Sequence, residues 1–234
     1  MGDRREQPAS EPGADLERII ELVKHQIIFG RLKPRERLTE DELCAQFGVS
    51  RHLIRAAFVR LEHLGLVTRR PNKGAAVRDF SVEEVEEIYD MRALLQAEAA
   101  RRIPLPPPRS LLDRLYAIHA ACADAIARQD LGLVSAVNDE FHRTVFAAAG
   151  NRYLAQIIER LWTETLGIHC YAIGDPTLLA RSHAEHGLII DALARGDRDE
   201  LVRLVVDHMW LPLNAYKRVH GGWRAAMPPV RATG

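Results

Sequence analysis

Residues 47–67, FGVSRHLIRAAFVRLEHLGLV, predict a turn, a capped helix and the start of a strand. Gly48 supplies the permissive backbone that a tight turn between two helices needs. Ser50 stands where a helix N-cap belongs, because its hydroxyl can accept a backbone N–H of the first turn. The stretch therefore predicts the second helix of a helix-turn-helix. Its apolar residues recur at helical spacing and predict one buried face, made of Leu53, Ala57, Leu61 and Leu64.

Two arginines give this helix a candidate chemistry. Arg51 and Arg55 lie one turn apart near its start. In a helix-turn-helix, residues near the start of the second helix reach the edges of DNA bases, and arginine suits a guanine edge or a phosphate. The alternative interpretation is a surface helix with two solvated arginines. The segment by itself favours DNA binding.

The residues after the helix predict a wing. Residues 66–70 form a candidate strand, residues 71–74 (PNKG) a turn by composition, and residues 75–78 a returning strand. This wing would carry Lys73 at its tip and Gly74 where backbone could approach a phosphate closely. We therefore predict a winged helix-turn-helix domain over residues 15–78.

At this point the chain resembles the GntR family of bacterial transcription regulators. The matching pieces are residues 28–34 (IFGRLKP), 37–40 (RLTE), the helix-turn-helix and 70–75 (RPNKGA). The sequence departs from the family at Arg35, His52-Leu53 and Ala56, and His52 is the departure that bears on base recognition. The expected DNA-binding residues are Arg37, Ser50, Arg51, His52, Arg55, Lys73 and Gly74.

Charge separates the chain into two parts. Residues 15–78 carry 13 Lys or Arg against 8 Asp or Glu, a net charge of +5. Residues 79–221 carry 15 against 21, a net charge of −6. A basic module joined to an acidic one indicates one face for nucleic acid and one for another purpose.

Length and composition set further bounds. The 234 residues suffice for two domains, and no apolar run approaches the 18 residues of a membrane span. Residues 1–14 read as a disordered tail without the apolar core of a signal peptide, and residues 221–234 as a flexible tail. The three cysteines, Cys44, Cys122 and Cys170, are too dispersed for a disulfide framework. We expect a cytoplasmic, nucleoid-associated protein with no membrane partner.

Residues 79–220 predict a helical domain. Ser81 and Glu84 form a capping box that opens a long helix. Further helices are expected at about 109–128, 131–149, 153–173, 177–194 and 198–220, with Pro212 kinking or splitting the last. Short connections favour an antiparallel bundle, so the fold class is mostly α. The expected apolar face of the first helix is Val85, Ile88, Met91, Leu94 and Leu95.

Polar residues within this bundle form a candidate metal site. Asn138 and His142 are four residues apart and share a helix face, while His186 and His208 lie on later helices. Imidazoles from three helices and a short polar side chain can surround a metal ion inside a bundle. A lone histidine is more often a core residue, and with ten histidines in the chain the pattern alone is weak.

The GntR subfamily with a helical FCD effector domain (FadR-like regulators) adds weight to this site. The subfamily carries an Asp-x-x-x-His pair and two later histidines, which residues 138–142 (NDEFH), His186 and His208 match. Residues 147–151 (AAAGN) are also similar. Asn138 replaces the usual aspartate, so the ligand set brings no charge and weaker binding is expected. Three imidazoles and an amide oxygen suit zinc or nickel.

The resemblance also implies an effector and an assembly. Regulators of this family are two-fold dimers on palindromic operators, and their effectors are often small carboxylic acids, sugar acids or fatty-acid derivatives. Arg92 stands at the family's usual arginine and is the expected contact to such an acid. Gln96 replaces the family's common glutamate, so Arg92 cannot pair with that residue.

We therefore predict a ligand-responsive DNA-binding transcription regulator that forms a homodimer. The alternative is a metal-sensing or constitutive DNA binder with no organic effector. A metal-dependent hydrolase is a less favoured alternative, in which Asp139 or Glu185 would act as the general base. Neither residue sits in a recognisable catalytic motif, so we expect no enzyme.

Overall fold

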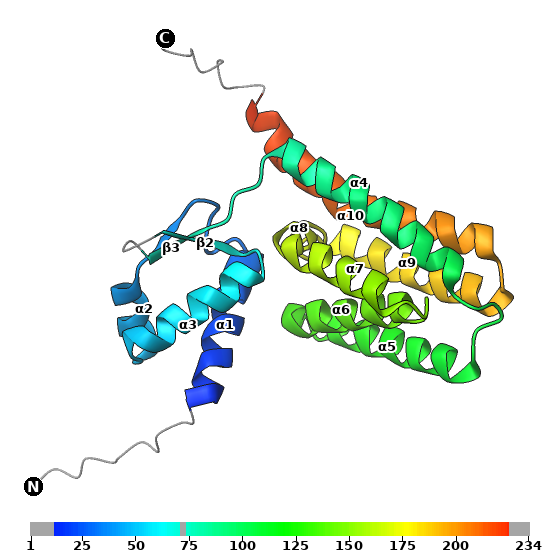
Figure 1. Ribbon diagram of the computed structural model, residues 1–234, viewed down its shortest axis with the longest axis horizontal. Coiled ribbons are helices and arrows are strands. Elements are labelled where there is room, and N and C mark those ends of the chain that lie inside the picture. The colour runs from blue at the N-terminus through cyan, green and yellow to red at the C-terminus, as the bar shows by residue number, and fades with distance from the viewer. Residues whose placement is uncertain (1–11, 71–73, 225–234) are drawn as a thin grey trace, which may run out of the picture. The chain divides into compact units, whose positions relative to one another are not determined.

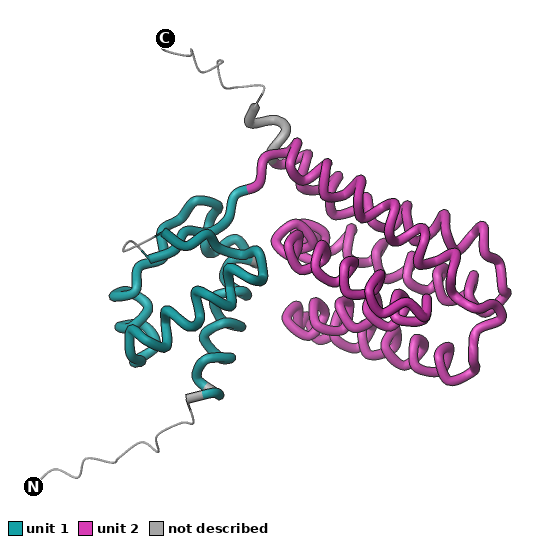
Figure 2. Tube along the Cα trace, in the orientation of Figure 1, with its two compact units in different colours: residues 1–79 teal, residues 80–234 magenta. Residues whose placement is uncertain are grey.

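The computed structural model describes residues 12–70 and 74–224 of the chain. The chain divides into two compact units between Asp79 and Phe80, one residue after the expected domain boundary (Figure 2). Mostly helical secondary structure with one small sheet confirms the predicted fold class (Figure 1). None of the described helices combines the length and the apolarity that crossing a membrane requires.

The first unit is a winged helix-turn-helix. Gly48 ends α2 in the left-handed region at φ 68°, and the Ser50 hydroxyl accepts the Leu53 N–H, as the sequence predicts. The core packs α1 against α3 through apolar side chains such as Ile19, Val23 and Leu61. The elements are α1 Pro12–Ile28, β1 Arg37–Leu38, α2 Glu40–Phe47, α3 Arg51–His63, β2 Val67–Arg70 and β3 Gly74–Val77.

Strand β1 is a feature that the sequence did not predict. It pairs antiparallel with β3, which also pairs antiparallel with β2, giving the sheet order β1-β3-β2. Gly74 lies at the start of β3 with φ +79°, and a Cβ there would meet the Leu38 carbonyl oxygen at 2.4 Å. The requirement for glycine therefore follows from the contact between β1 and β3 within the sheet.

The second unit is a bundle of seven described helices. Helix α4 packs along α10, while α5 packs on α6 and α9. The main core is formed by apolar residues of α4, α5, α6, α7, α9 and α10, among them Leu115, Phe141 and Ile190. The helices are α4 Val82–Arg102, α5 Arg109–Ala127, α6 Leu131–Ala147, α7 Arg152–Glu164, α8 Leu166–Ile173, α9 Pro176–Arg195 and α10 Arg198–Arg224.

Several expected helix boundaries were wrong. The expected helix at 153–173 is two helices, because the Thr165 hydroxyl hydrogen-bonds back to the Leu161 and Trp162 carbonyls where α7 ends. Pro212 does not split α10, whose packing along α4 offsets the cost of the missing hydrogen bond. The apolar face expected for α4 also differs in part from the buried face in the structure.

That face of α4 is more polar than expected. Met91 and Leu94 are 50% and 67% exposed, whereas Tyr89, Arg92 and Gln96 are almost fully buried. Val85 is buried and Ile88 and Leu95 pack against the core clusters, so the expected face is correct in part. Helical periodicity did not show that polar residues share the buried side of this helix. The buried face therefore brings an arginine and a glutamine into the bundle.

The expected tails were too long at both inner ends. Helix α1 begins at Pro12, since proline is favoured in the first turn of a helix, and Asp15 follows near the positive end of the helix dipole. Helix α10 continues through Arg224, because a glycine weakens a helix by only about 1 kcal/mol relative to alanine and need not end it. The remainder of both tails lies outside the described residues.

Candidate metal centre and nucleic-acid interface

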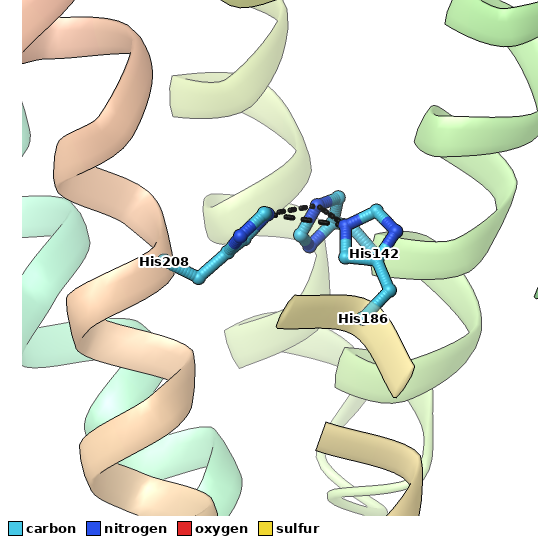
Figure 3. Close-up of side chains that lie close together, drawn as sticks. All are labelled: His142, His186 and His208. Atoms are coloured by element: carbon cyan, nitrogen blue, oxygen red, sulfur yellow. Dashed lines mark hydrogen bonds between the residues drawn. The ribbon is translucent and has the colours of Figure 1, made fainter. Parts of the chain in front are cut away.

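Three histidines from three helices converge inside the bundle. His142 comes from α6, His186 from α9 and His208 from α10, and their imidazoles point toward one another (Figure 3). The Nε2 atoms lie 3.2 Å apart for His142 and His186, 3.1 Å for His186 and His208, and 3.3 Å for His142 and His208. The sequence prediction thus chose, among ten histidines, three that meet.

These imidazoles fit a divalent metal ion. Burial, followed by the neighbouring histidines, holds the pKa of His142 and of His186 well below its ordinary value, so both rings are neutral ligands. For a metal–nitrogen distance of about 2.1 Å, nitrogens with these separations subtend roughly 95–104° at an ion, between octahedral and tetrahedral values. Asn138 lines the same cavities as the histidines.

A carboxylate orients one of the three rings. His208 Nδ1 lies 2.8 Å from Glu185 Oε2, and the other oxygen of Glu185 accepts a hydrogen bond from Arg181 at 2.7 Å. Asp139 accepts the indole N–H of Trp162 at 2.9 Å. Both carboxylates that the sequence offered as general bases therefore hold neighbouring side chains in place.

Arg92 lies in the bundle without a countercharge. Its side chain is 1% exposed and forms no ion pair with any residue that the structure describes. Its Nη1 donates to Thr165 Oγ1 at 2.9 Å and lies 3.0 Å from His169 Nε2. Burial lowers the pKa of Arg92, but two aromatic faces stabilise its charge, at 4.5 Å from Tyr89 and 4.9 Å from Trp162.

Two of the cavities that adjoin the histidines share lining residues. The inner one, about 30 Å³, is lined by Arg92, Asn138, His142, His208 and further residues of the bundle. The outer one is a cleft of about 320 Å³ along α6 and α7. His142 and Trp162 line both cavities, so these side chains separate the inner cavity from the cleft.

The sequence did not indicate His169 or Trp162 as site residues. Trp162 contacts His142, with ring centroids 4.3 Å apart, and His169, with ring centroids 3.9 Å apart, in both cases with tilted ring planes. Both residues lie near the join of α7 and α8, where the sequence predicted one uninterrupted helix. The one sequence feature that relates to them is Arg92 on α4, because a buried arginine needs polar partners and finds them at the join of α7 and α8.

In the first unit, both predicted recognition arginines are exposed on α3. Arg51 pairs with Asp41 at 2.8 Å and Arg55 pairs with Glu40 at 2.9 Å, so carboxylates at the start of α2 hold both side chains. The hydrogen bond from Arg55 lowers the pKa of Glu40, which stays ionised. The guanidinium groups are thus oriented on the surface before any partner binds.

The other expected DNA-binding residues are placed as follows. A groove of about 590 Å³ lies between α3 and the wing, with His52, Arg55 and Gly74 in its lining. It also includes Arg69 and Arg70 of β2, which the prediction had placed on the wing without a role in DNA binding. Arg37 is exposed on β1, and Ser50 is the N-cap of α3. Lys73 lies outside the described residues.

Comparisons with known proteins agree with both units. Residues 16–77 match the model of the bacterial regulatory proteins of the gntR family, and residues 87–210 match the FCD domain. The chain is 26% identical over 196 residues to the HTH-type transcriptional repressor RspR of Escherichia coli K12, covering 82% of this chain and 85% of the relative. It is 28% identical over 211 residues to a protein of Paenarthrobacter nicotinovorans named as a probable D-xylose utilization operon transcriptional repressor, covering 89% and 92%.

Solved structures show the same fold. A GntR transcriptional regulator from Rhodococcus sp. RHA1 superposes with a TM-score of 0.69 at 22% identity, covering 89% of this chain and 98% of that one. E. coli McbR/YncC gives a TM-score of 0.66 at 21% identity, covering 88% and 98%. The gntR family model and the relative named as a transcriptional repressor both describe regulators, in agreement with the expectation that the chain is no enzyme. The chain belongs to the GntR family of DNA-binding transcription regulators and carries an FCD effector-binding domain.

Proposed function

We propose that operator binding by this regulator is controlled by a small carboxylate held in the FCD domain beside a divalent metal ion. The observation that carries the proposal is Arg92, a buried cation with no carboxylate partner among the described residues, in the cavity that His142 and His208 also line. A buried charge is costly unless it is paired, so an anionic ligand is the missing partner. Gln96, where the family has glutamate, leaves that role to the ligand.

The proposed metal ligands are His142, His186 and His208, with the Asn138 amide oxygen as a weak fourth. Zinc or nickel suits this donor set, and such an ion would supply a positive centre with open positions for a carboxylate. The substitution Asn138→Asp should tighten metal binding by adding a charge. Metal content that is unaffected by His186→Ala and His208→Ala would show that the histidines are ordinary core residues.

In the first unit, we assign operator contacts to Arg51, Arg55 and His52 of α3, with Arg37 and Lys73 assisting. Support comes from the exposure of both α3 arginines and from the groove that Arg55 lines with the wing. Arginines near the start of a recognition helix are suited to read guanine edges in the major groove. The protein would act on chromosomal DNA in the cytoplasm.

A two-fold homodimer on a palindromic operator is the assembly we propose. Exposed apolar side chains on two helices that pack together support it, namely Met91 and Leu94 on α4 and Tyr153 and Ile157 on α7. Burying such a surface between two copies is a common solution in homo-oligomers. Light scattering after size-exclusion chromatography gives the mass directly, and a monomer at micromolar concentration would contradict the assembly.

Elemental analysis of purified protein, followed by a thermal-shift screen of carboxylates, tests the proposal. We expect one zinc or nickel per chain and a rise in melting temperature with one class of acid, because a ligand that binds only the native state stabilises it. An Arg92→Leu variant should lose the acid-dependent rise. Bound metal without any responsive acid would instead support a metal-sensing or constitutive DNA binder.

A further inference from the structure

Three buried nitrogen atoms around the inner cavity have no hydrogen-bond partner among the described residues. They are Arg92 Nε, Gln96 Nε2 and His169 Nδ1, on side chains that are 1%, 2% and 4% exposed. All three residues line the same cavity. Buried polar groups in folded proteins are nearly always paired, so this group of donors indicates a ligand.

The tautomer of His169 makes its free nitrogen a donor. Arg92 can only donate, so His169 Nε2, at 3.0 Å, accepts its hydrogen bond. The ring is neutral, because burial and Arg92 hold the pKa of His169 well below its ordinary value, and its single proton therefore lies on Nδ1. The cluster formed by Arg92, Gln96 and His169, here the donor corner, thus presents only N–H groups at these atoms.

The donor corner and the histidine triad meet in one cavity, because His142 and His208 line it together with Arg92, Gln96 and His169. Trp162 contacts His142 with ring centroids 4.3 Å apart, and it also contacts Arg92 at 4.9 Å and His169 at 3.9 Å. A ligand of only a few bonds can therefore reach both places. A single carboxylate at the triad would leave the donor corner without acceptors.

We propose that the effector is a short dicarboxylic acid, with one carboxylate beside the histidine triad and the second in the donor corner. This inference rests on the proposed function and adds to it the class of acid and two residues that select it, Gln96 and His169. An ammonium group in place of the second carboxylate would meet donors and a like charge. The corner therefore selects against amino acids of the same length.

Calorimetric titration of the full-length, nickel-loaded protein tests this selection with malonate, succinate and glutarate. Propionate, butyrate and valerate are the matched monocarboxylates, and β-alanine and γ-aminobutyrate carry an amine at the second end. We expect the best dicarboxylate to bind about 10- to 100-fold more tightly than the monocarboxylate of equal length, as charge-assisted hydrogen bonds are lost in the latter. The amino acids should bind no better than the monocarboxylates.

Two variants assign the preference to the donor corner. Gln96→Glu is nearly isosteric and places a carboxylate beside Arg92, so it should abolish the dicarboxylate preference without changing nickel content. His169→Phe keeps an aromatic ring at this position but removes both nitrogens, and it should also abolish the dicarboxylate preference. Met209→Leu, a volume-conserving change in the same cavity, is the control and should retain the preference.

The outcomes separate this inference from the function on which it rests. Equal affinity of the wild-type protein for succinate and butyrate, or a preference that survives Gln96→Glu, would overturn the dicarboxylate assignment alone. Failure of every acid to bind nickel-loaded protein would overturn the proposed function and this inference together.

Discussion

The imidazole of His208 and the carboxylate of Glu185 form a hydrogen-bonded pair, with 2.8 Å between Nδ1 and Oε2. Burial acts to raise the pKa of Glu185, but hydrogen bonds from His208 and Arg181 lower it on balance. The ionised carboxylate only accepts, so Nδ1 of His208 donates this hydrogen bond, and Nε2 is the nitrogen that faces the centre of the triad. Glu185 therefore positions a candidate metal ligand.

The substitution Glu185→Gln should weaken metal binding. Partners that orient a ligating histidine typically contribute 10- to 100-fold in metal affinity, and loss of the charge should cost about tenfold here. Competition with a chromophoric chelator measures the affinity. Glu200→Gln on the exposed face of α10 is the matched control. Equal affinities for Glu185→Gln and the control would contradict the positioning role.

The metal-free protein should lose stability as the pH falls below about 6.5. Burial lowers the pKa of His142, His169 and His186 in the folded state, while in the unfolded chain these groups titrate near 6.5. Below that pH the unfolded chain binds more protons, so the free energy of unfolding falls with falling pH, by up to about 1.4 kcal/mol per pH unit for each histidine. Urea unfolding in chelator between pH 5 and 8 measures this. A flat profile would show that these rings are not buried and neutral.

The change Arg55→Ala should weaken operator binding by about 1–3 kcal/mol if the side chain contacts a base bidentately. Fluorescence anisotropy at fixed salt concentration gives the affinity. Arg60→Ala is the control, because Arg60 is exposed on the same helix but lies near its end, 3.9 Å from Glu17. Unchanged affinity in both Arg51→Ala and Arg55→Ala proteins would remove these residues from the interface.

The change Gly74→Ala should destabilise the first unit more than Gly48→Ala does. Both glycines have a positive φ, +79° and +68°, which costs alanine roughly 1–2 kcal/mol. Only at Gly74 would the added Cβ also meet backbone, the Leu38 carbonyl oxygen at 2.4 Å. Urea unfolding of the two variants compares them directly, and equal losses of stability would mean that the β1–β3 contact is looser than described.

The sequence predicts correctly those features that neighbouring residues specify together, such as a turn, a helix cap and the helix that follows. Gly48 and Ser50 form the predicted turn and cap, and the helix follows. Of the predicted stripe, Ala57 and Leu61 are buried, whereas Ile54 and Phe58 are buried in place of Leu53 and Leu64. The histidine triad required the family resemblance, because spacing along one chain cannot show which of ten histidines meet.

The remaining features depend on contacts between distant segments. Strand β1 has only two residues and exists through its pairing with β3. Thr165 ends α7, and the partners that Arg92 finds there, Thr165 and His169, lie more than 70 positions away along the chain. Periodicity places side chains on a helix face, but it does not identify the partners that make a buried arginine tolerable.

The connection between the units is short and anchored at adjacent residues. Asp79 accepts a hydrogen bond from Arg35 of the first unit at 2.6 Å, and the Phe80 carbonyl accepts the Tyr216 hydroxyl of the second at 2.7 Å. We therefore expect an acid that favours one arrangement of the second unit to change operator binding through its differential affinity for the two arrangements.

Measuring the affinity of the acid with and without saturating operator DNA shows whether the FCD site controls DNA binding. Linkage requires that, if the acid weakens operator binding by some factor, operator weakens acid binding by the same factor, typically about 5- to 150-fold. We predict a lower acid affinity in the presence of operator, measured by calorimetry on metal-loaded protein. Equal affinities in the two conditions would contradict the account, because the site would then bind its acid without regulating DNA binding.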